Sequence, residues 1–349
     1  MPAAPAAPYA DGARLLADIG GTNARFALET APGRIADIST LACAEYQCFE
    51  DAVVDYLASV AERRGAQLER ITHAVIAIAQ PVKGDLVAMT NHHWSFSIAA
   101  AKQRLHLQTL LVVNDFAALA MAVPSLAAQD VVAIGGEHAQ AKTGAVIGLV
   151  GAGTGLGVAG LIPAEGRWMA LESEGGHVAF SPSDERELAV LRFCWKRYEH
   201  VSAERLVSGP GIATIYRALA DHAGLVPNPL PTETIVARAL AGSDVLCMEA
   251  LDCFCGMLGT VAGNLAVTLC AHGGIYLGGG VIPRLGAYFA ASSFRARFEN
   301  KGRFSAFNAA IPTWLITAPF PALTGAAVLL QRELAGQPAA QREEALHAS

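Results

Sequence analysis

A strand–turn–strand pattern occurs twice in this chain and limits the folds available to it. The two segments are LLADIGGTNARFAL, residues 15–28, and GLVGAGTGLGVAGL, residues 148–161. In each, two apolar stretches flank a turn of glycine and threonine, which is typical of a hairpin of buried strands. Because one such hairpin opens each half of the chain, the repeat predicts a duplicated architecture with two lobes.

The two turns have a composition that suits phosphate. Glycine lets backbone N–H groups approach a ligand closely, and a threonine hydroxyl adds a donor, so such a turn can hold phosphate without lysine. Two of these turns suggest a polyphosphate bound between them. A pair of ordinary hairpins is the alternative, and the glycine pattern alone leaves it open.

Other nucleotide-binding loops fit the sequence less well. Glycines stand at alternate positions from Gly151 to Gly157, so G-x-G-x-x-G is not matched, and a strand follows where a Rossmann fold has a helix. The segment GEHAQAKT, residues 136–143, resembles a Walker A loop, but Ala141 precedes its lysine and no helix-forming segment follows. We expect this segment to be an exposed connection.

Composition excludes several classes of protein. With 349 residues, 53% hydrophobic and 16% charged, the chain can bury large cores, and at about 100–200 residues per domain two lobes are expected. A net charge of −6 provides no basic field, so nucleic acid is not an expected partner. The seven cysteines are scattered without a C-x-x-C pair, as in reduced cytoplasmic proteins. Cys253 and Cys255 form the closest approach to a metal motif.

Two long stretches without charge, 143–164 and 253–283, could be mistaken for membrane spans. In the first stretch, glycines separate two strand-like halves. In the second stretch, a pattern typical of a helix is followed by a short strand and a glycine loop. We therefore expect soluble core and no membrane. The N-terminus MPAAPAAPYADG lacks the charged and apolar regions of a signal peptide and is expected to form a loose arm.

Polar side chains follow a predicted strand in LQTLLVVNDFAALA, residues 107–120. The strand ends at Asn114 and Asp115, and a helix begins directly afterwards, so both residues lie at the carboxyl end of a strand. Open α/β sheets bind their ligands at that edge. Both residue types are also good helix N-caps. Helix capping could explain one of these two residues. The presence of both favours a functional role.

Three further polar residues stand on predicted turns. Glu174 and His177 flank a Gly-Gly pair in ESEGGHV, and Glu204 lies in SAER. Carboxylates that accept from adjacent hydroxyls, with an imidazole beside them, suit a polyhydroxylated substrate. A structural role for the lone histidine, and a capping role for Glu204 after Ser202, remain the alternatives.

Six motifs together resemble bacterial glucokinase of the proteobacterial type, within the actin/hexokinase/Hsp70 ATPase superfamily. In chain order they are LADIGGTNARFAL, VVNDF, GAGTGLG, EGGHV, SAERLVSGPG and GGIYLGGGVIPR. The match runs from about Leu15 to about Leu334. The resemblance implies an α/β, two-lobed, duplicated actin-like ATPase fold, which is ribonuclease H-like, with the ligand cleft between the lobes.

The resemblance also assigns site residues. It implies ATP binding by Ala17, Asp18, Ile19, Gly20, Gly21, Thr22 and Asn23, by Gly153, Thr154 and Gly155, and by Gly278, Gly279 and Gly280. It implies sugar binding by Asn114, Asp115, Glu174, His177 and Glu204, with Asp115 as the catalytic base. Asp18 is expected to hold a water of the Mg²⁺ hydration shell or a water on the attacking side, because a carboxylate directly against phosphate would repel it. A turn-capping role is the alternative for Asp18.

The implied activity is ATP-dependent phosphorylation of glucose to glucose 6-phosphate, the first step of glycolysis, with ATP and Mg²⁺. Two alternatives stay open: a kinase for fructose, mannose or an N-acetylhexosamine, and a non-catalytic sugar-sensing regulator on the same fold. Related proteins of the repressor–open reading frame–kinase group carry a cysteine-rich zinc site after their Glu-Gly-Gly-His. No cysteine occurs in EGGHVAFSPSDERE, so zinc is not expected.

The resemblance further implies a cytoplasmic homodimer whose lobes close over the substrates. The expected small lobe is 1–125, to which a C-terminal helix at 318–337 returns, and the expected large lobe is 126–317. Two departures from the family pattern are visible. Gln80 replaces a small residue or cysteine, and LESEGGH lacks a Pro-Gly pair.

Overall fold

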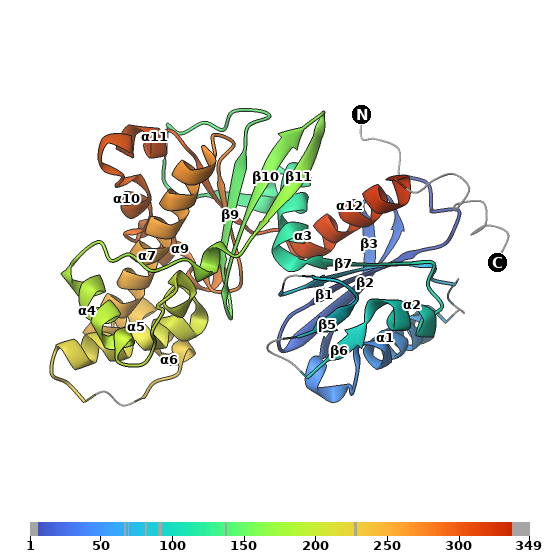
Figure 1. Cartoon of the computed structure of the whole chain (residues 1–349), viewed down its shortest axis with the longest axis horizontal. Helices are drawn as coiled ribbons and strands as arrows, with labels where there is room; N and C mark the ends of the chain where they lie inside the picture. The colour runs from blue at the N-terminus through green and yellow to red at the C-terminus, as the bar shows by residue number, and fades with distance from the viewer. Residues whose placement is uncertain are drawn as a thin grey trace. The chain divides into compact units, whose positions relative to one another are not determined.

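The structure is a computed structural model that describes residues 6–65, 68, 70–80, 82–89, 93–136, 138–226 and 229–336. The chain divides into two compact units. Unit 1 combines Met1–Ser125 with Pro319–Ser349, and unit 2 is Leu126–Ala318. The C-terminal helix α12 (Pro321–Gly336) therefore packs with the N-terminal elements, where it appears red among blue and cyan segments (Figure 1). Gln337, at the end of the expected returning helix, lies outside the described residues.

Unit 1 is built on a mixed five-stranded sheet. In spatial order its strands are β3 (Arg34–Ala42), β2 (Asn23–Ala31), β1 (Arg14–Ile19), β4 (His73–Ile78) and β7 (Thr109–Asn114). β1 pairs antiparallel with β2 and parallel with β4, and β4 pairs parallel with β7. A separate hairpin is formed by β5 (Leu86–Ala88) and β6 (Ser95–Ser97).

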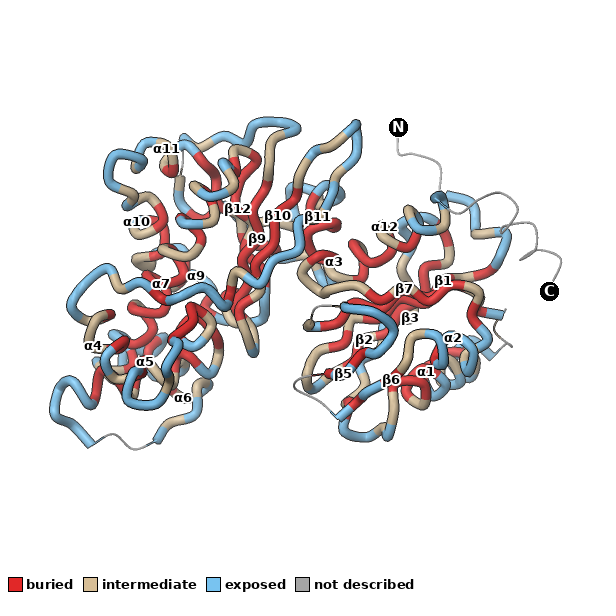
Figure 2. Tube along the Cα trace, viewed as in Figure 1, coloured by how far each residue is buried: buried red, intermediate tan, exposed pale blue. Residues whose placement is uncertain are grey.

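Helices cover both faces of this sheet. Its helical elements are η1 (Cys43–Glu45), α1 (Phe49–Arg64), α2 (Ile98–Arg104), α3 (Asp115–Ala122), η2 (Val123–Ser125) and α12. Alternate residues of β1 point to opposite faces, as the two-residue period of a strand requires. Leu15 joins a core cluster with residues of α1, whereas Leu16 joins a cluster with Ala118 of α3 and Leu323 of α12. In Figure 2, β1, β2 and β4 of this sheet are mostly buried.

Unit 2 contains a six-stranded sheet of the same plan. Its spatial order is β11 (Arg167–Ser173), β10 (Leu156–Ala164), β9 (Ile147–Ala152), β12 (Ile275–Gly278), β13 (Thr313–Ile316) and β8 (Val131–Ala133). β9 pairs antiparallel with β10 and parallel with β12, which pairs parallel with β13. The first five strands repeat the order and directions of the five strands in unit 1. The predicted duplication is therefore confirmed.

The remaining elements of unit 2 are helical. They are η3 (Ala128–Asp130), η4 (Gly175–His177), α4 (Glu185–Trp195), η5 (Ala203–Arg205), α5 (Gly209–His222), α6 (Thr232–Leu240), α7 (Val245–Leu269), α8 (Ile282–Leu285), α9 (Ala287–Ala291), α10 (Phe294–Glu299), η6 (Gly302–Phe304) and α11 (Ser305–Ala309). Within the described part of the chain, α7 alone is long and apolar enough to cross a membrane, and 61% of its most apolar window is buried inside the protein. Its neighbours include α5, α6 and α10. It is the core helix of unit 2.

The two uncharged stretches noted in the sequence lie in this core. The first stretch contains the β9–β10 hairpin. The second stretch covers α7 from Cys253 onwards, β12 and the glycine turn after β12. The described residues of segment 136–143 form neither helix nor strand, and most of them are exposed. Glu137 lies outside the described residues.

Candidate active site

The first glycine turn joins β1 to β2 and is held by backbone hydrogen bonds. The N–H of Gly20 donates to the carbonyl of Asn23 at 3.0 Å, which closes the turn. The N–H of Cys43, in η1, donates to the carbonyl of Thr22 at 2.9 Å. The Thr22 side chain is exposed, whereas the side chains of Ala17 and Ile19 are fully buried. Those two residues can therefore offer only backbone groups to a nucleotide.

Asp18 stands at the end of β1, directly opposite Arg25 of β2. Its Oδ2 accepts a hydrogen bond from the Arg25 guanidinium at 3.1 Å, and its side chain is 18% exposed. Burial raises the pKa of Asp18 above its ordinary value, and the guanidinium partly opposes that rise. Asp18 thus forms a cross-strand ion pair with Arg25. Neither the magnesium role nor the turn-capping role considered from the sequence included this contact.

Asn114 and Asp115 lie where the sequence predicted them, at the end of β7 and the first position of α3. Asn114 caps the helix, because its Oδ1 accepts from the N–H groups of Phe116 and Ala117 at 2.9 and 3.0 Å. Asp115 is half-buried, and its Oδ1 accepts from the N–H of Phe116 at 2.8 Å. Capping is therefore the observed role of Asn114. Its amide nitrogen donates to the carbonyl of Gln80 at 3.4 Å, and its contact with sugar stays a prediction.

The second glycine turn lies between β9 and β10 in unit 2. The N–H of Gly153 donates to the carbonyl of Gly155 at 2.8 Å, and the carbonyl of Gly153 accepts from Gly209, the first residue of α5, at 2.8 Å. The turn is thus closed on itself and held by a helix start. Thr154 is exposed at its tip.

The third predicted glycine segment, Gly278 to Gly280, lies against the second turn. The N–H of Val281 donates to the carbonyl of Ala152 at 3.1 Å. Gly279 has a φ of +84°, and a Cβ there would overlap the backbone of Ala152. Only glycine fits this left-handed, crowded position. Gly278 is buried at the end of β12, whereas Gly279 and Gly280 are exposed.

The three polar residues predicted from turns come together in unit 2. His177 Nε2 lies 3.7 Å from Glu174 Oε2, and His177 Nδ1 lies 3.9 Å from Glu204 Oε1. The imidazole is therefore flanked by a carboxylate on each side. The side chains of Glu174 and His177 are each 58% exposed, which leaves polar atoms accessible to a solute.

The Gly-Gly pair before His177 has a steric cause. A Cβ on Gly176 would overlap the carbonyl oxygen of Leu156, and a Cβ on Gly175 would press on Val158. The η4 turn therefore packs directly on the start of β10. Glu204 also reaches this point, because its Oε2 accepts from the N–H of Leu156 at 2.9 Å. Ser202 makes no side-chain cap at η5, so the capping interpretation of Glu204 is not supported.

Sequence reasoning missed two kinds of residue at these loops. Arg25 could have been found from hairpin register, because residues directly opposite on paired strands interact. Gly209 and Val281 bind the second turn through backbone N–H groups, and no local sequence signal marks those contacts.

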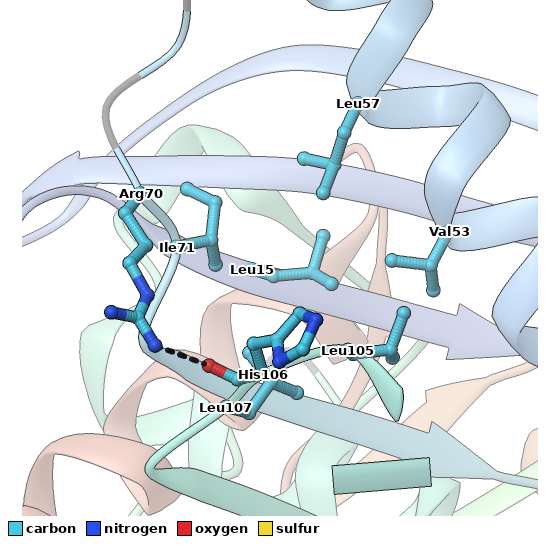
Figure 3. Close-up of a pocket in the computed structure, with 8 residues that line it drawn as sticks. All are labelled: Leu15, Val53, Leu57, Arg70, Ile71, Leu105, His106 and Leu107. Carbon is cyan, nitrogen blue, oxygen red and sulfur yellow. Dashed lines mark hydrogen bonds between the residues drawn. The ribbon is translucent and has the colours of Figure 1, made fainter. Parts of the chain in front are cut away.

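A cavity of about 300 Å³ in unit 1 contains none of the predicted site residues. Figure 3 shows apolar side chains around it, with Arg70 donating to the carbonyl of His106 at its rim. Its lining includes Leu15 at the start of β1, Ile71 before β4 and Leu107 before β7. It therefore lies at the amino ends of these parallel strands, whereas Asp18 and Asn114 lie at the carboxyl ends. Among the described residues, no group of three His, Cys, Asp or Glu side chains is arranged to hold a metal.

Comparison with known proteins gives a consistent result. The glucokinase family model matches residues 15–333. The chain is 56% identical over 337 residues to the bifunctional protein glk of Burkholderia pseudomallei (strain 1710b), with 96% of this chain and 51% of that protein covered. It thus spans about half the length of this relative. It is 51% identical over 327 residues to the glucokinase of Chromobacterium violaceum, with 92% of this chain and 90% of that protein covered.

A solved structure agrees with the sequence matches. The crystal structure of a glucokinase from an Antarctic psychrotroph has a TM-score of 0.80 to this chain at 36% identity, covering 92% of this chain and 99% of that one. The actin-like ATPase fold implied by the motifs is confirmed by this likeness and by the duplicated sheets. The chain belongs to the glucokinase family.

Proposed function

We propose that the chain transfers the γ-phosphoryl group of ATP to the 6-hydroxyl of glucose. Family membership supplies the reaction class. The observation that carries the assignment to particular residues is the cluster of His177 between two carboxylates, one of which also bonds the second glycine turn. In this proposal the residues that bind sugar hydroxyls adjoin a turn that binds phosphate, as a sugar kinase requires.

Asp115 acts as the base in this proposal. A sugar hydroxyl is a weak nucleophile, so a carboxylate must orient it and accept its proton as the O6–P bond forms and the bond from phosphorus to the departing ADP oxygen breaks. The hydrogen bond from Phe116 N–H holds one carboxylate oxygen of Asp115 in place. In the proposal, the carboxylate held in this way orients the sugar hydroxyl and accepts its proton.

Unit 2 contributes binding groups. Glu174 and Glu204 accept from sugar hydroxyls, and His177 donates or accepts between them. Backbone N–H groups of the second turn and of Thr22 in the first turn contact the phosphates, since no P-loop lysine stands there.

Mg²⁺ neutralises phosphate charge when it is bound with ATP. The ion commonly binds proteins through one or two carboxylates and retains several waters. Asp18 fits this mode of binding, because it is a carboxylate beside the first turn and Arg25 bonds one of its oxygens. In the proposal Asp18 holds a water of the ion, and Arg25 holds Asp18. We also propose, from family resemblance, that the enzyme is a cytoplasmic homodimer.

The proposal is tested by ADP release with Mg-ATP against glucose, fructose, mannose and N-acetylglucosamine, using the wild type and Asp115→Asn. We expect turnover with glucose, a loss of about 10²-fold or more in the variant, and glucose affinity within about tenfold of the wild type, because asparagine keeps the shape and the acceptor for Phe116. Turnover with a different hexose would reassign the substrate. Sugar binding without turnover in the wild type would indicate a regulator instead.

A further inference from the structure

Glu204 contacts two different parts of unit 2 with its two carboxylate oxygens. Oε2 accepts from the backbone N–H of Leu156 at 2.9 Å, and Oε1 lies 3.9 Å from Nδ1 of His177. One oxygen therefore faces the sugar-binding cluster. The other is bonded to the first residue after the second glycine turn.

The contact with the turn is close as well as polar. Leu156 begins β10 directly after Gly155, and a Cβ on Gly155 would lie 2.5 Å from Glu204 Oε2. The turn is otherwise held by the bond between Gly153 and Gly155 and by the N–H of Gly209. Glu204 is thus the carboxylate that packs on the outgoing end of this turn, and a movement of its side chain would release the Leu156 N–H.

We propose that Glu204 couples the two substrates: sugar held by this carboxylate orders the turn that binds ATP phosphates. The inference rests on the proposed function, in which both ligands bind here. The Glu204 side chain is 34% exposed, so it has space to leave the turn. A sugar hydroxyl that donates to Oε1 holds the carboxylate in the orientation in which Oε2 accepts from Leu156. The ordering of the turn is then already complete when ATP arrives.

This coupling is reciprocal. If sugar increases the affinity for nucleotide by some factor, nucleotide must increase the affinity for sugar by the same factor. Factors of about 5–150 are typical of coupled sites. Glu204 is therefore a positioning residue for the ATP turn in addition to a sugar ligand, and its two roles can be separated by substitution.

Glu174 offers a matched control. It faces the same imidazole from the other side at 3.7 Å. Within the described part of the chain, it makes no hydrogen bond to the second turn. Glu174→Gln should therefore weaken sugar binding while leaving nucleotide affinity and the coupling factor unchanged.

The experiment is calorimetric titration with a non-hydrolysable ATP analogue, without glucose and with saturating glucose. We expect Glu204→Ala to weaken analogue binding about 3- to 10-fold without glucose, the loss of about one hydrogen bond, and to reduce the coupling factor to about one. Glu204→Gln keeps an acceptor for the Leu156 N–H, so analogue affinity without glucose should stay within about twofold of the wild type. Identical behaviour of Glu204→Ala and Glu174→Gln would overturn the proposal.

Hydrogen exchange at the Leu156 amide gives a second readout that needs no ligand. Glu204→Ala should speed this exchange about tenfold or more, and Glu204→Gln should not. An unchanged rate in Glu204→Ala would also overturn the coupling, even if the enzyme is a glucokinase. A wild-type chain that binds neither glucose nor the analogue, yet shows the expected exchange, would instead overturn the proposed function and leave Glu204 as a structural support of the turn.

Discussion

Gly325 of α12 lies directly against the carbonyl oxygen of Ala118 in α3, so close that a Cβ at position 325 would overlap that oxygen. The two helices share the largest interhelical contact of unit 1. The absence of a side chain at this one position allows the C-terminal helix to dock on the N-terminal elements.

Gly325→Ala is therefore expected to destabilise unit 1. Alanine favours helix by about 1 kcal/mol over glycine, but forcing α12 away from α3 should exceed that gain and leave a net loss of about 1–3 kcal/mol. Unfolding in urea followed by circular dichroism would measure it. Gly336→Ala is the control, because no atom lies within 4 Å of a Cβ there, and it should change stability by less than about 0.5 kcal/mol. Equal effects of the two substitutions would contradict the tight crossing.

Arg25→Met should destabilise the chain in a pH-dependent way. Burial raises the pKa of Asp18 and Arg25 opposes the rise, so removal of the guanidinium raises the pKa further. The folded variant then holds its Asp18 proton to higher pH than the folded wild type. Its deficit in stability should be largest near neutral pH, about 1–2 kcal/mol for a partly exposed pair, and should shrink as the pH falls towards about 4.

The double variant Asp18→Asn, Arg25→Met provides the control for this ion pair. With no carboxylate left to bury, most of the pH dependence of the deficit should disappear. Urea unfolding at several pH values would measure both effects. A deficit that grows as the pH falls would contradict the sign derived from the burial of Asp18.

Thiol labelling should separate the cysteines by burial. Burial raises the pKa of Cys253 and of Cys255 to about 12 each, so both remain protonated at pH 8, and only the thiolate reacts. Cys270 is exposed. We expect a disulfide reagent at pH 8 to label Cys270 rapidly and the two α7 thiols only as fast as the protein unfolds. Cys270→Ser should remove the fast phase, and rapid labelling of Cys253 in that variant would contradict the packing of α7.

The features that could be predicted from sequence are local ones. Both hairpins, and the strand that ends at Asn114, follow from apolar runs interrupted by glycine or polar residues within a few positions. The contact between Glu204 and Leu156 joins residues 48 apart in sequence. The contact between Gly279 and Ala152 likewise joins distant segments. Such pairings are decided by sheet order and helix packing, which no single segment encodes.

The roles of individual site residues also differ in how far the sequence predicts them. Asn114 could be predicted as a helix cap from its neighbours alone, and the structure confirms that role. The partner of Asp18 was missed, although the register of its own hairpin places Arg25 opposite it. The glycines of the first and second turns were expected to free the backbone for phosphate. Gly176 and Gly279 show a second cause, since each makes room for the backbone of a neighbouring strand.

Gly155→Ala gives an independent test of how the second turn and Glu204 fit together. Its methyl group would lie 2.5 Å from Glu204 Oε2, so the flexible carboxylate must turn away and lose the Leu156 N–H. Under the proposed function, glucose affinity should fall about tenfold, since a hydrogen bond to a charged group contributes about 1.5 kcal/mol. Gly153→Ala, where no atom lies within 4 Å of the added Cβ, should keep glucose affinity within about twofold. Calorimetric titration with glucose measures both, and equal losses would show that the turn acts on sugar binding by a route other than the Glu204 carboxylate.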